Sequence, residues 1–382
     1  AVFLFPSFSF SEKEKEVIGG GAVGKSLPAA PCPEPTSTPQ KTKARAIMTT
    51  LTLNLGENSY DIHIGGGLIS VAGEFFSLGR KVLVVTDSGV PAGYAKAVAE
   101  QCREAHTVTV KQGEGSKTVP VFENLCREMM KHGFTRKDCV VAVGGGVVGD
   151  LAGFAAASYM RGIDFYNIPT TVLSSVDSSV GGKTGVNLDG IKNIIGAFCQ
   201  PKGVIVDPAL TKTLPARQVS NGLAEAVKMA LTFDPDLFAL FENGDPAKDL
   251  EKIIVRSLRL KADVVGKDEK EAGLRRVLNF GHTIGHGIES LGLGYYHGEC
   301  VALGMIPMCS PEVRARLIPV LEKLNLPVSA QFDRKRALEA ILHDKKSGGG
   351  CISAVFVDKI GSFRIENITP ARIAELLDGA LK

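Results

Sequence analysis

The stretch CVVAVGGGVVGD, Cys139–Asp150, decides the fold of this chain. An apolar run that ends in three consecutive glycines is typical of a buried strand followed by a tight turn and a helix. Gly144, Gly146 and Gly149 match G-x-G-x-x-G, in which glycines let the backbone approach a pyrophosphate at a helix N-terminus. Such turns also use glycine for steric reasons alone, and the acidic ribose partner of a standard Rossmann fold has no clear candidate here. The stretch indicates an α/β fold and leaves both interpretations of the turn open.

Short apolar segments on both sides of this stretch extend the α/β pattern. TLTLNL (50–55) and YDIHIG (60–65) alternate in polarity, which predicts a hairpin, and KVLVVTD (81–87) predicts a buried strand. Between the strands, GYAKAVAEQCREA (93–105) and FENLCREMMKHG (122–133) carry apolar residues at helical spacing. Strands that alternate with helices predict a mostly parallel sheet, so we expect a Rossmann-like domain over residues 48–206.

The apolar spacing becomes helical beyond residue 206. The segments GLAEAVKMALTF (222–233), LEKIIVRSLRLKADVVGKD (250–268) and VRARLIPVLEKL (313–324) all show it, which predicts a mainly helical second domain over residues 207–382. A late hairpin is expected from ISAVFVD (352–358) and GSFRIENI (361–368). At 382 residues the chain is long enough for two separate cores.

Residues 1–47 differ from the rest, because SLPAAPCPEPTSTPQKTKARA (26–46) cannot bury a core. We expect a disordered extension, either a targeting segment or non-native sequence ahead of Met48. The net charge of +3, spread without long blocks, gives no reason to expect nucleic acid or a membrane as partner. Eight cysteines without a CxxC pair favour a reduced compartment, so we expect the cytoplasm, or a plastid if the extension is a transit peptide.

Three of the seven histidines gather in LNFGHTIGHGIE (278–289) and YHGE (296–299). His282 and His286 are four apart and share a helical face, and catalytic zinc commonly takes three nitrogen or oxygen ligands. Metal ligands, acid–base groups and ordinary packing all remain open for these residues and His297. Glu225 and Lys228, three apart on a helix, are either a surface ion pair or, given their small apolar neighbours, the lining of a cavity.

A small, polar, Gly-rich segment, 174–187, suits a loop that closes over a phosphorylated or polyhydroxylated ligand, although a solvated surface loop is an equal alternative. The charged and amide side chains in and around this segment are Asp150, Arg161, Asp177, Lys183, Lys192 and Asn193.

Taken together, these motifs resemble the 3-dehydroquinate synthases of the sugar phosphate cyclase superfamily. The resemblance is carried in the family's order, from about residue 60 to 360, by GGGVVGDLAGFAAASYMRG, IPTTVLSSVDSSVGGKTGVN, KNIIGAF, GLAEAVK, KDEKEAGLRRVLNFGHTIGHGIE, HGECVALGM and DKKSGG. It implies an α/β domain that binds NAD and a helical domain that holds a divalent metal, Zn²⁺ or Co²⁺, with the active site between them in a homodimer.

The resemblance also implies roles for individual residues. The implied metal ligands are Glu225, His282 and His297, while His286 would face the substrate. The implied NAD site comprises Asp87, Glu114, Lys117, Gly146, Val147, Val148, Asp150, Thr170, Thr171, Asp177, Lys183 and Lys192. The implied substrate site comprises Arg161, Asp177, Lys183, Asn193, Lys228, Lys261, Arg275, Asn279, His286 and Lys345, with Lys183, Lys228, Lys261, Arg275, Asn279 and His286 as the catalytic set. Gly89 stands where the family usually has Asn.

The reaction implied is the conversion of 3-deoxy-D-arabino-heptulosonate 7-phosphate to 3-dehydroquinate and phosphate. A hydroxyl at C5 is transiently oxidised, phosphate leaves, the hydride returns and the ring closes by an aldol reaction. Arg275 and Lys261 would clamp the carboxylate, Lys183, Asn193 and Lys345 the phosphate, and Arg161 would reach the neighbouring subunit's phosphate. Lys228 and His286 would move protons, with a burial-lowered or histidine-range pKa.

Three other functions fit parts of the pattern. A sister cyclase acting on sedoheptulose 7-phosphate or glucose 6-phosphate would use the same cofactors, but those sugars lack the carboxylate that Arg275 and Lys261 would bind. A metal-dependent NAD polyol dehydrogenase shares the two-domain plan but has no need of the phosphate-binding lysines. A non-enzymatic NAD-binding module would not need the polar constellation.

Overall fold

The computed structural model of the chain describes residues 48–344 and 351–379. The predictions for residues 1–47 and for Lys345 lie outside these residues. Among the described helices, none combines the length and apolar character needed to cross a membrane.

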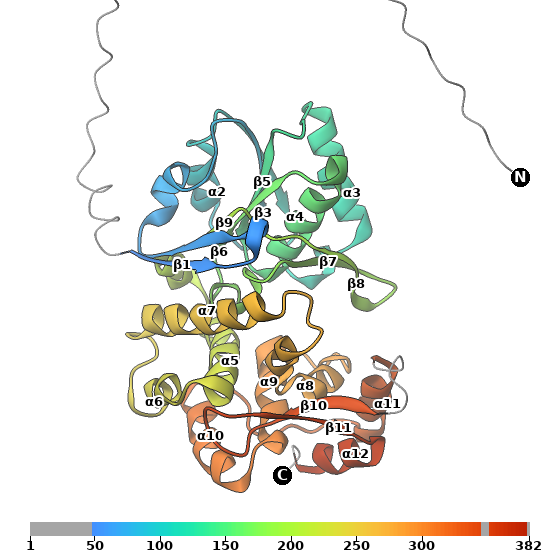
Figure 1. The fold of residues 1–382 in the computed structure, drawn as a ribbon. Helices are drawn as coiled ribbons and strands as arrows, with labels where there is room; N and C mark the ends of the chain where they lie inside the picture. Colours follow the sequence, from blue (N-terminus) through green and yellow to red (C-terminus); the bar gives the residue numbers. More distant parts are fainter. Residues whose placement is uncertain (1–47, 345–350, 380–382) are drawn as a thin grey trace, which may run out of the picture. The chain divides into compact units, whose positions relative to one another are not determined.

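A seven-stranded sheet forms the first part of the described chain (Figure 1), in the spatial order β1-β2-β9-β6-β5-β3-β4. Its hairpin β1–β2 is antiparallel, as predicted, and the remaining neighbours are parallel. The strands are β1 (Thr49–Leu53), β2 (Tyr60–Ile64), β3 (Lys81–Asp87), β4 (Glu104–Val110), β5 (Cys139–Gly144), β6 (Asp164–Pro169) and β9 (Gly203–Val206). Strand β4 takes the last residues of the segment for which a helix was predicted, since α2 (Ala92–Ala99) ends earlier.

Helices cover both faces of this sheet because its central strands are apolar on both faces. Val82 and Val84 of β3 pack with α2, whereas Leu83 and Val85 pack with α3 (Val119–Lys131) and α4 (Gly146–Ser158) on the other side. Six strands are parallel, and the five from β3 onward lie in the order β4-β3-β5-β6-β9, which is 2-1-3-4-5 when counted along the chain, so the winding reverses between β3 and β5. Ligands of doubly wound folds bind at that reversal, outside the carboxyl ends of the strands.

The second part is mainly helical, and the late hairpin of β10 (Ile352–Phe356) and β11 (Arg364–Ile368) is present as predicted. The helices are α5 (Ala216–Phe233), α6 (Pro235–Asn243), α7 (Leu250–Lys267), α8 (His282–Glu289), α9 (His297–Met305), α10 (Pro311–Lys323), α11 (Arg334–Asp344) and α12 (Pro370–Gly379). One apolar cluster runs from β1, β2 and β9 into these helices, so both parts share a core.

The segment 174–187 is not a loop throughout, which corrects the expectation from its composition. Ser174–Ser178 form a turn of π-helix, and β7 (Lys183–Leu188) pairs antiparallel with β8 (Ile191–Phe198). Glycine serves close packing here, because a Cβ on Gly196 would lie 2.2 Å from the Thr184 carbonyl oxygen of the paired strand. Hairpin β7–β8 therefore presents Lys183, Lys192 and Asn193 from strands.

Candidate active site

The predicted NAD residues gather at the carboxyl edge where the sheet reverses. Asp87 ends β3, the glycine turn follows β5, and Thr170 and Thr171 follow β6, with the Thr170 amide donating to the Gly144 carbonyl at 2.9 Å. Lys117 is buried and its ammonium contacts Asp150 of α4 and Asn193 of β8. Burial raises the pKa of Asp150 in spite of that ammonium. The structure thus brings residues from five segments to one edge.

The turn after β5 packs closely against Ser178. A Cβ on Gly146 would lie 2.9 Å from Ser178 Oγ, so this approach requires glycine at the first turn of α4. The hydroxyls of Ser178 and Ser179 are buried and have no hydrogen-bond partner among the described residues. Free first-turn amides and unpaired hydroxyls suit a phosphate-bearing cofactor, so these residues fit NAD.

Gln112 occupies the space beside Gly89. A Cβ on Gly89 would lie 2.3 Å from Gln112 Cδ, and the Gln112 amide end surrounds that position. The Gly89 amide donates to Asp87 Oδ1 at 2.7 Å, which keeps the turn closed without a side chain at residue 89. The side-chain amide of Gln112 therefore occupies the space beside residue 89, where the family usually has the amide of an Asn side chain.

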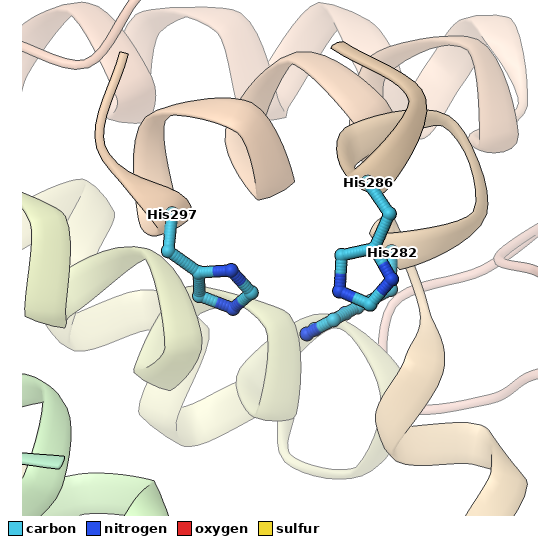
Figure 2. Close-up of side chains that lie close together, drawn as sticks. All are labelled: His282, His286 and His297. Carbon is cyan, nitrogen blue, oxygen red and sulfur yellow. The ribbon is translucent and has the colours of Figure 1, made fainter. Parts of the chain in front are cut away.

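Helices α5, α8 and α9 bring Glu225, His282 and His297 together. Glu225 Oε1 lies 3.5 Å from His282 Nε2 and 3.3 Å from His297 Nε2. Close packing makes this convergence possible, because Gly298 sits so near α5 that a Cβ there would lie 1.9 Å from the Asn221 carbonyl oxygen. Figure 2 shows His282 and His286 on one helix facing His297 on the next.

The polar atoms around these three side chains are arranged as in metal sites. His282 Nδ1 lies 3.1 Å from the Phe280 carbonyl and His297 Nδ1 lies 3.2 Å from Glu289 Oε2, which leaves both Nε2 atoms toward Glu225. Both Glu225 oxygens are buried and, among the described residues, lack an aligned hydrogen bond, although the Lys228 ammonium lies within ion-pair distance of Oε2. Anchored Nδ1 atoms and a buried carboxylate facing two Nε2 atoms fit a divalent metal.

Buried charges around Glu225 shift several pKa values. Burial raises the pKa of Glu225, but Lys228, His282 and His297 together bring it well below its ordinary range. Burial lowers the pKa of His297, yet its contacts with Glu225 and Glu289 raise it to about 9. Burial also lowers the pKa of Lys228, but Glu225 and Asp177 raise it overall. The expectation of a lowered Lys228 pKa is therefore wrong for the metal-free protein, because two carboxylates hold the ammonium charged.

His286 makes a second ligand set geometrically possible. One nitrogen each of His282, His286 and His297 lie within 4.8 Å of one another, and the ring centroids of His282 and His286 are 5.1 Å apart. His286 is the exposed member of the three. The assignment of Glu225, His282 and His297 as the metal ligands therefore stays a prediction. Substitution of single histidines can distinguish the two ligand sets.

We expect His282→Ala to lose bound metal, whereas His286→Ala should keep the metal and lose turnover. The anchored Nδ1 of His282 and its 3.5 Å approach to Glu225 support the first half. Metal content of the two purified variants by atomic emission checks this, alongside turnover. Equal metal loss in both variants would show that all three histidines ligate.

Three of the predicted substrate residues, Lys228, Lys261 and Arg275, are buried charges. Lys261 Nζ donates to the Asp177 carbonyl at 2.6 Å and forms an ion pair with Asp177 Oδ1 at 2.7 Å. Arg275, 2 % exposed, donates to the Gly181 carbonyl at 2.9 Å. Burial lowers the pKa of both Lys261 and Arg275. Glu225 and Lys228 are each 1 % exposed, so the surface ion pair is excluded in favour of a buried one.

Glu271 belongs with these residues and was missed from sequence. Its carboxylate pairs with Lys183 and accepts from Asn279 Nδ2 at 2.6 Å, so it links two predicted substrate residues. Residues 267–271 form a charged run, so an acidic residue within it is expected at the protein surface. Only the position of Glu271 within KDEKEAGLRRVLNFGHTIGHGIE could have indicated a role.

Arg161 lies away from this set within the chain. It follows α4 at the end opposite to Gly146, about 20 Å along a helix of 13 residues at 1.5 Å per residue. Its guanidinium has no hydrogen bond or ion pair among the residues described.

Solved structures of sugar phosphate cyclases share this fold. A 2-deoxy-scyllo-inosose synthase complexed with carbaglucose-6-phosphate, NAD⁺ and Co²⁺ is 26% identical, with a TM-score of 0.79 over 87% of this chain and 100% of that one. A 2-epi-5-epi-valiolone synthase from Streptomyces hygroscopicus, with NAD⁺ and Zn²⁺ bound, is 28% identical, with a TM-score of 0.78 over 86% and 98%. The fold is thus that of the sugar phosphate cyclase class.

Sequence comparison narrows the class to a family. The models of the 3-dehydroquinate synthase N-terminal and C-terminal regions match residues 107–221 and 222–347. A 3-dehydroquinate synthase of Geobacter metallireducens is 43% identical over 356 residues, which is 87% of this chain and 98% of that protein. The chain belongs to the 3-dehydroquinate synthase family.

Proposed function

We propose that this protein converts 3-deoxy-D-arabino-heptulosonate 7-phosphate to 3-dehydroquinate and phosphate, as a carbon–oxygen lyase of the shikimate pathway. The observation that carries the proposal is the convergence of Glu225 Oε1 with the Nε2 atoms of His282 and His297, at 3.5 and 3.3 Å, beside the buried Lys228. Membership of the family supports the substrate.

Two groups are assigned to the site, NAD and a divalent metal, Zn²⁺ or Co²⁺. Support comes from the buried Ser178 and Ser179 hydroxyls beside the glycine turn, the buried Glu225 oxygens and the NAD⁺ with Co²⁺ or Zn²⁺ of the two solved relatives. When bound, NAD supplies a reversible hydride acceptor and the metal a Lewis acid for a substrate oxygen. Glu225, His282 and His297 would hold the metal, and the implied NAD residues at the sheet edge would hold the dinucleotide.

The chain's own residues bind and orient the substrate in this proposal. The guanidinium of Arg275 presents a planar fork to the carboxylate, with Lys261 as a second cation. Lys183 and Asn193 donate to the phosphate from hairpin β7–β8, and Lys345 is assigned to the same group from outside the described residues. Rigid placement of that phosphate assists its departure through proximity.

Proton transfer is assigned to His286, and stabilisation of negative charge to Lys228. His286 is the exposed member of the histidine cluster, so it can exchange a proton between the substrate and water. Lys228, held charged by Glu225 and Asp177, acts as a hydrogen-bond donor to a substrate oxygen and stabilises negative charge there.

The experiment that tests the proposal follows two products at once. Purified protein receives the heptulosonate phosphate, Zn²⁺ and less NAD than substrate, and both free phosphate and NADH absorbance are recorded. Phosphate release over many turnovers without NADH accumulation is expected. Steady NADH formation without phosphate would instead favour the polyol dehydrogenase, and activity only with sedoheptulose 7-phosphate or glucose 6-phosphate would favour a sister cyclase.

A homodimer is part of the proposal, with Arg161 acting on the neighbouring subunit's substrate. Its distance from its own site and its unpaired guanidinium support this. Mixing inactive Arg161→Ala and Lys228→Met proteins should restore roughly a quarter of wild-type activity, because random dimers form and each mixed dimer holds one working site. No recovery after the two variants are unfolded and refolded together would show that Arg161 does not act on the neighbouring subunit's substrate.

We also propose that the two domains divide between residues 206 and 207 and that the protein works in a reduced compartment. Strand β9 ends at Val206 and helices follow, which supports the first. Seven cysteines of the described residues are free thiols, which supports a reduced compartment such as the cytoplasm.

A further inference from the structure

Glu289, the last residue of α8, contacts two elements that are far apart in the chain. Its Oε2 lies 3.2 Å from His297 Nδ1 on α9, and its Oε1 accepts from Lys192 Nζ of β8 at 2.6 Å. The Glu289 side chain is 15% exposed, so the carboxylate is largely shielded from water. One carboxylate thus joins a predicted metal ligand to hairpin β7–β8.

His297 needs an acceptor at Nδ1 to present Nε2 toward Glu225. As the first residue of α9 and half-buried, its ring is not fixed by tight packing on every side. A hydrogen bond from Nδ1–H to a carboxylate selects the tautomer whose Nε2 lone pair is available, and it raises the basicity of the ring. For His282, the Phe280 carbonyl selects the same tautomer. This acceptor is a backbone oxygen, so the chain already fixes its position.

The Glu289 side chain, unlike a backbone carbonyl, must itself be held in place. Lys192 is the group that holds it, on the oxygen that His297 does not use. Exposed ion pairs contribute little on average, but this carboxylate is shielded and has both oxygens engaged. Because Lys192 belongs to β8, the position of the hairpin is transmitted to His297 through Glu289.

We propose that Glu289 is a positioning residue for the metal site and that Lys192 secures it, so that hairpin β7–β8 and metal binding are coupled through one carboxylate. This rests on the proposed function, in which Glu225, His282 and His297 hold the metal. Securing Glu289 is a role of Lys192 that is separate from its assignment to the NAD site.

The test is a double-substitution cycle on Zn²⁺ and Co²⁺ affinity, measured with the full-length protein by competition with a chromophoric chelator. Glu289→Gln should weaken metal binding by about 10- to 100-fold and alter the visible Co²⁺ spectrum, the range typical of outer-shell changes. Lys192→Met should weaken it less, Lys192→Arg should restore it, and Lys192→Met should add nothing in the Glu289→Gln background. Glu242→Gln, which breaks an ion pair with Arg316 elsewhere, is the matched control.

The measured affinities test the role of Glu289, the role of Lys192 and the metal site separately. Wild-type metal affinity in Glu289→Gln would overturn the positioning role while leaving the metal site intact. An equal loss from Lys192→Met in both backgrounds, or tighter binding in that variant, would overturn the securing role of Lys192. If the wild type bound neither ion, the proposed metal site itself would fail and this inference with it.

Discussion

Glu225→Gln should abolish metal binding and reduce turnover by about 10³-fold, since Lewis-acid stabilisation is worth several kcal/mol and each 1.36 kcal/mol is a factor of ten. The same change leaves the Lys228 ammonium buried at 1 % exposure without its nearest carboxylate. Breaking a buried pair from one side typically costs 3 kcal/mol or more, so we expect a loss of about 3 kcal/mol in the free energy of unfolding. Metal content, turnover, and urea denaturation with a chelator present measure the three effects.

A double variant separates the two consequences of this change. Glu225→Gln with Lys228→Met removes both charges, and replacing a whole buried pair by uncharged side chains is often neutral for stability. We expect the double variant to regain most of the lost stability while binding no metal. If it stayed as unstable as Glu225→Gln alone, the loss would come from repacking of α5 and not from the stranded ammonium.

The strands of the sheet were largely predictable because their residues are locally unambiguous. The runs at 81–87 and 139–144 are apolar on both faces, and the hairpin at 49–64 alternates in polarity. The strand order was not predictable, since β3 pairs with β4 on one side and β5 on the other through contacts that no local pattern encodes. That order nevertheless creates the reversal at which Asp87 and the glycine turn meet.

The composition of residues 174–187 predicted a loop where the structure has part of hairpin β7–β8. Its glycines are typical of loops, yet Gly185 and Gly196 serve the close approach of two strands. The apolar residues of β8 did not indicate burial either, because Ile191 and Ile194 are 48% and 57% exposed. Only pairing between strands distinguishes this arrangement from a loop.

The site was predictable where a motif fixes a role and not where tertiary contacts do. Spacing placed His282 and His286 on one helix, but the meeting of Glu225 with His297 depends on how α9 packs against α5 through Gly298. Glu271 and Glu289 were missed because single acidic residues look like solvated surface in sequence. Their importance comes from Lys183 and Lys192, which reach them from the other part of the fold.

Arg275→Lys should lower kcat/KM by about 10²-fold although the charge is conserved, because a misplacement of about 1 Å at a substrate contact costs that much. In the structure, Nη2 donates to the Gly181 carbonyl and Nη1 to that of Glu269, which fixes the plane of the guanidinium. These bonds use two of the five N–H donors and leave the others for a carboxylate. A lysine ammonium cannot keep both backbone contacts and still present two parallel donors.

Steady-state kinetics of Arg275→Lys, with exposed Arg276→Lys as the matched control, measure this effect. The loss should be smaller toward a substrate analogue that lacks the carboxylate, since the missing fork then has no partner in either protein. Near-wild-type kinetics would remove Arg275 from the carboxylate clamp. An equal loss with and without the carboxylate would give it a structural role instead, through its bonds to Gly181 and Glu269.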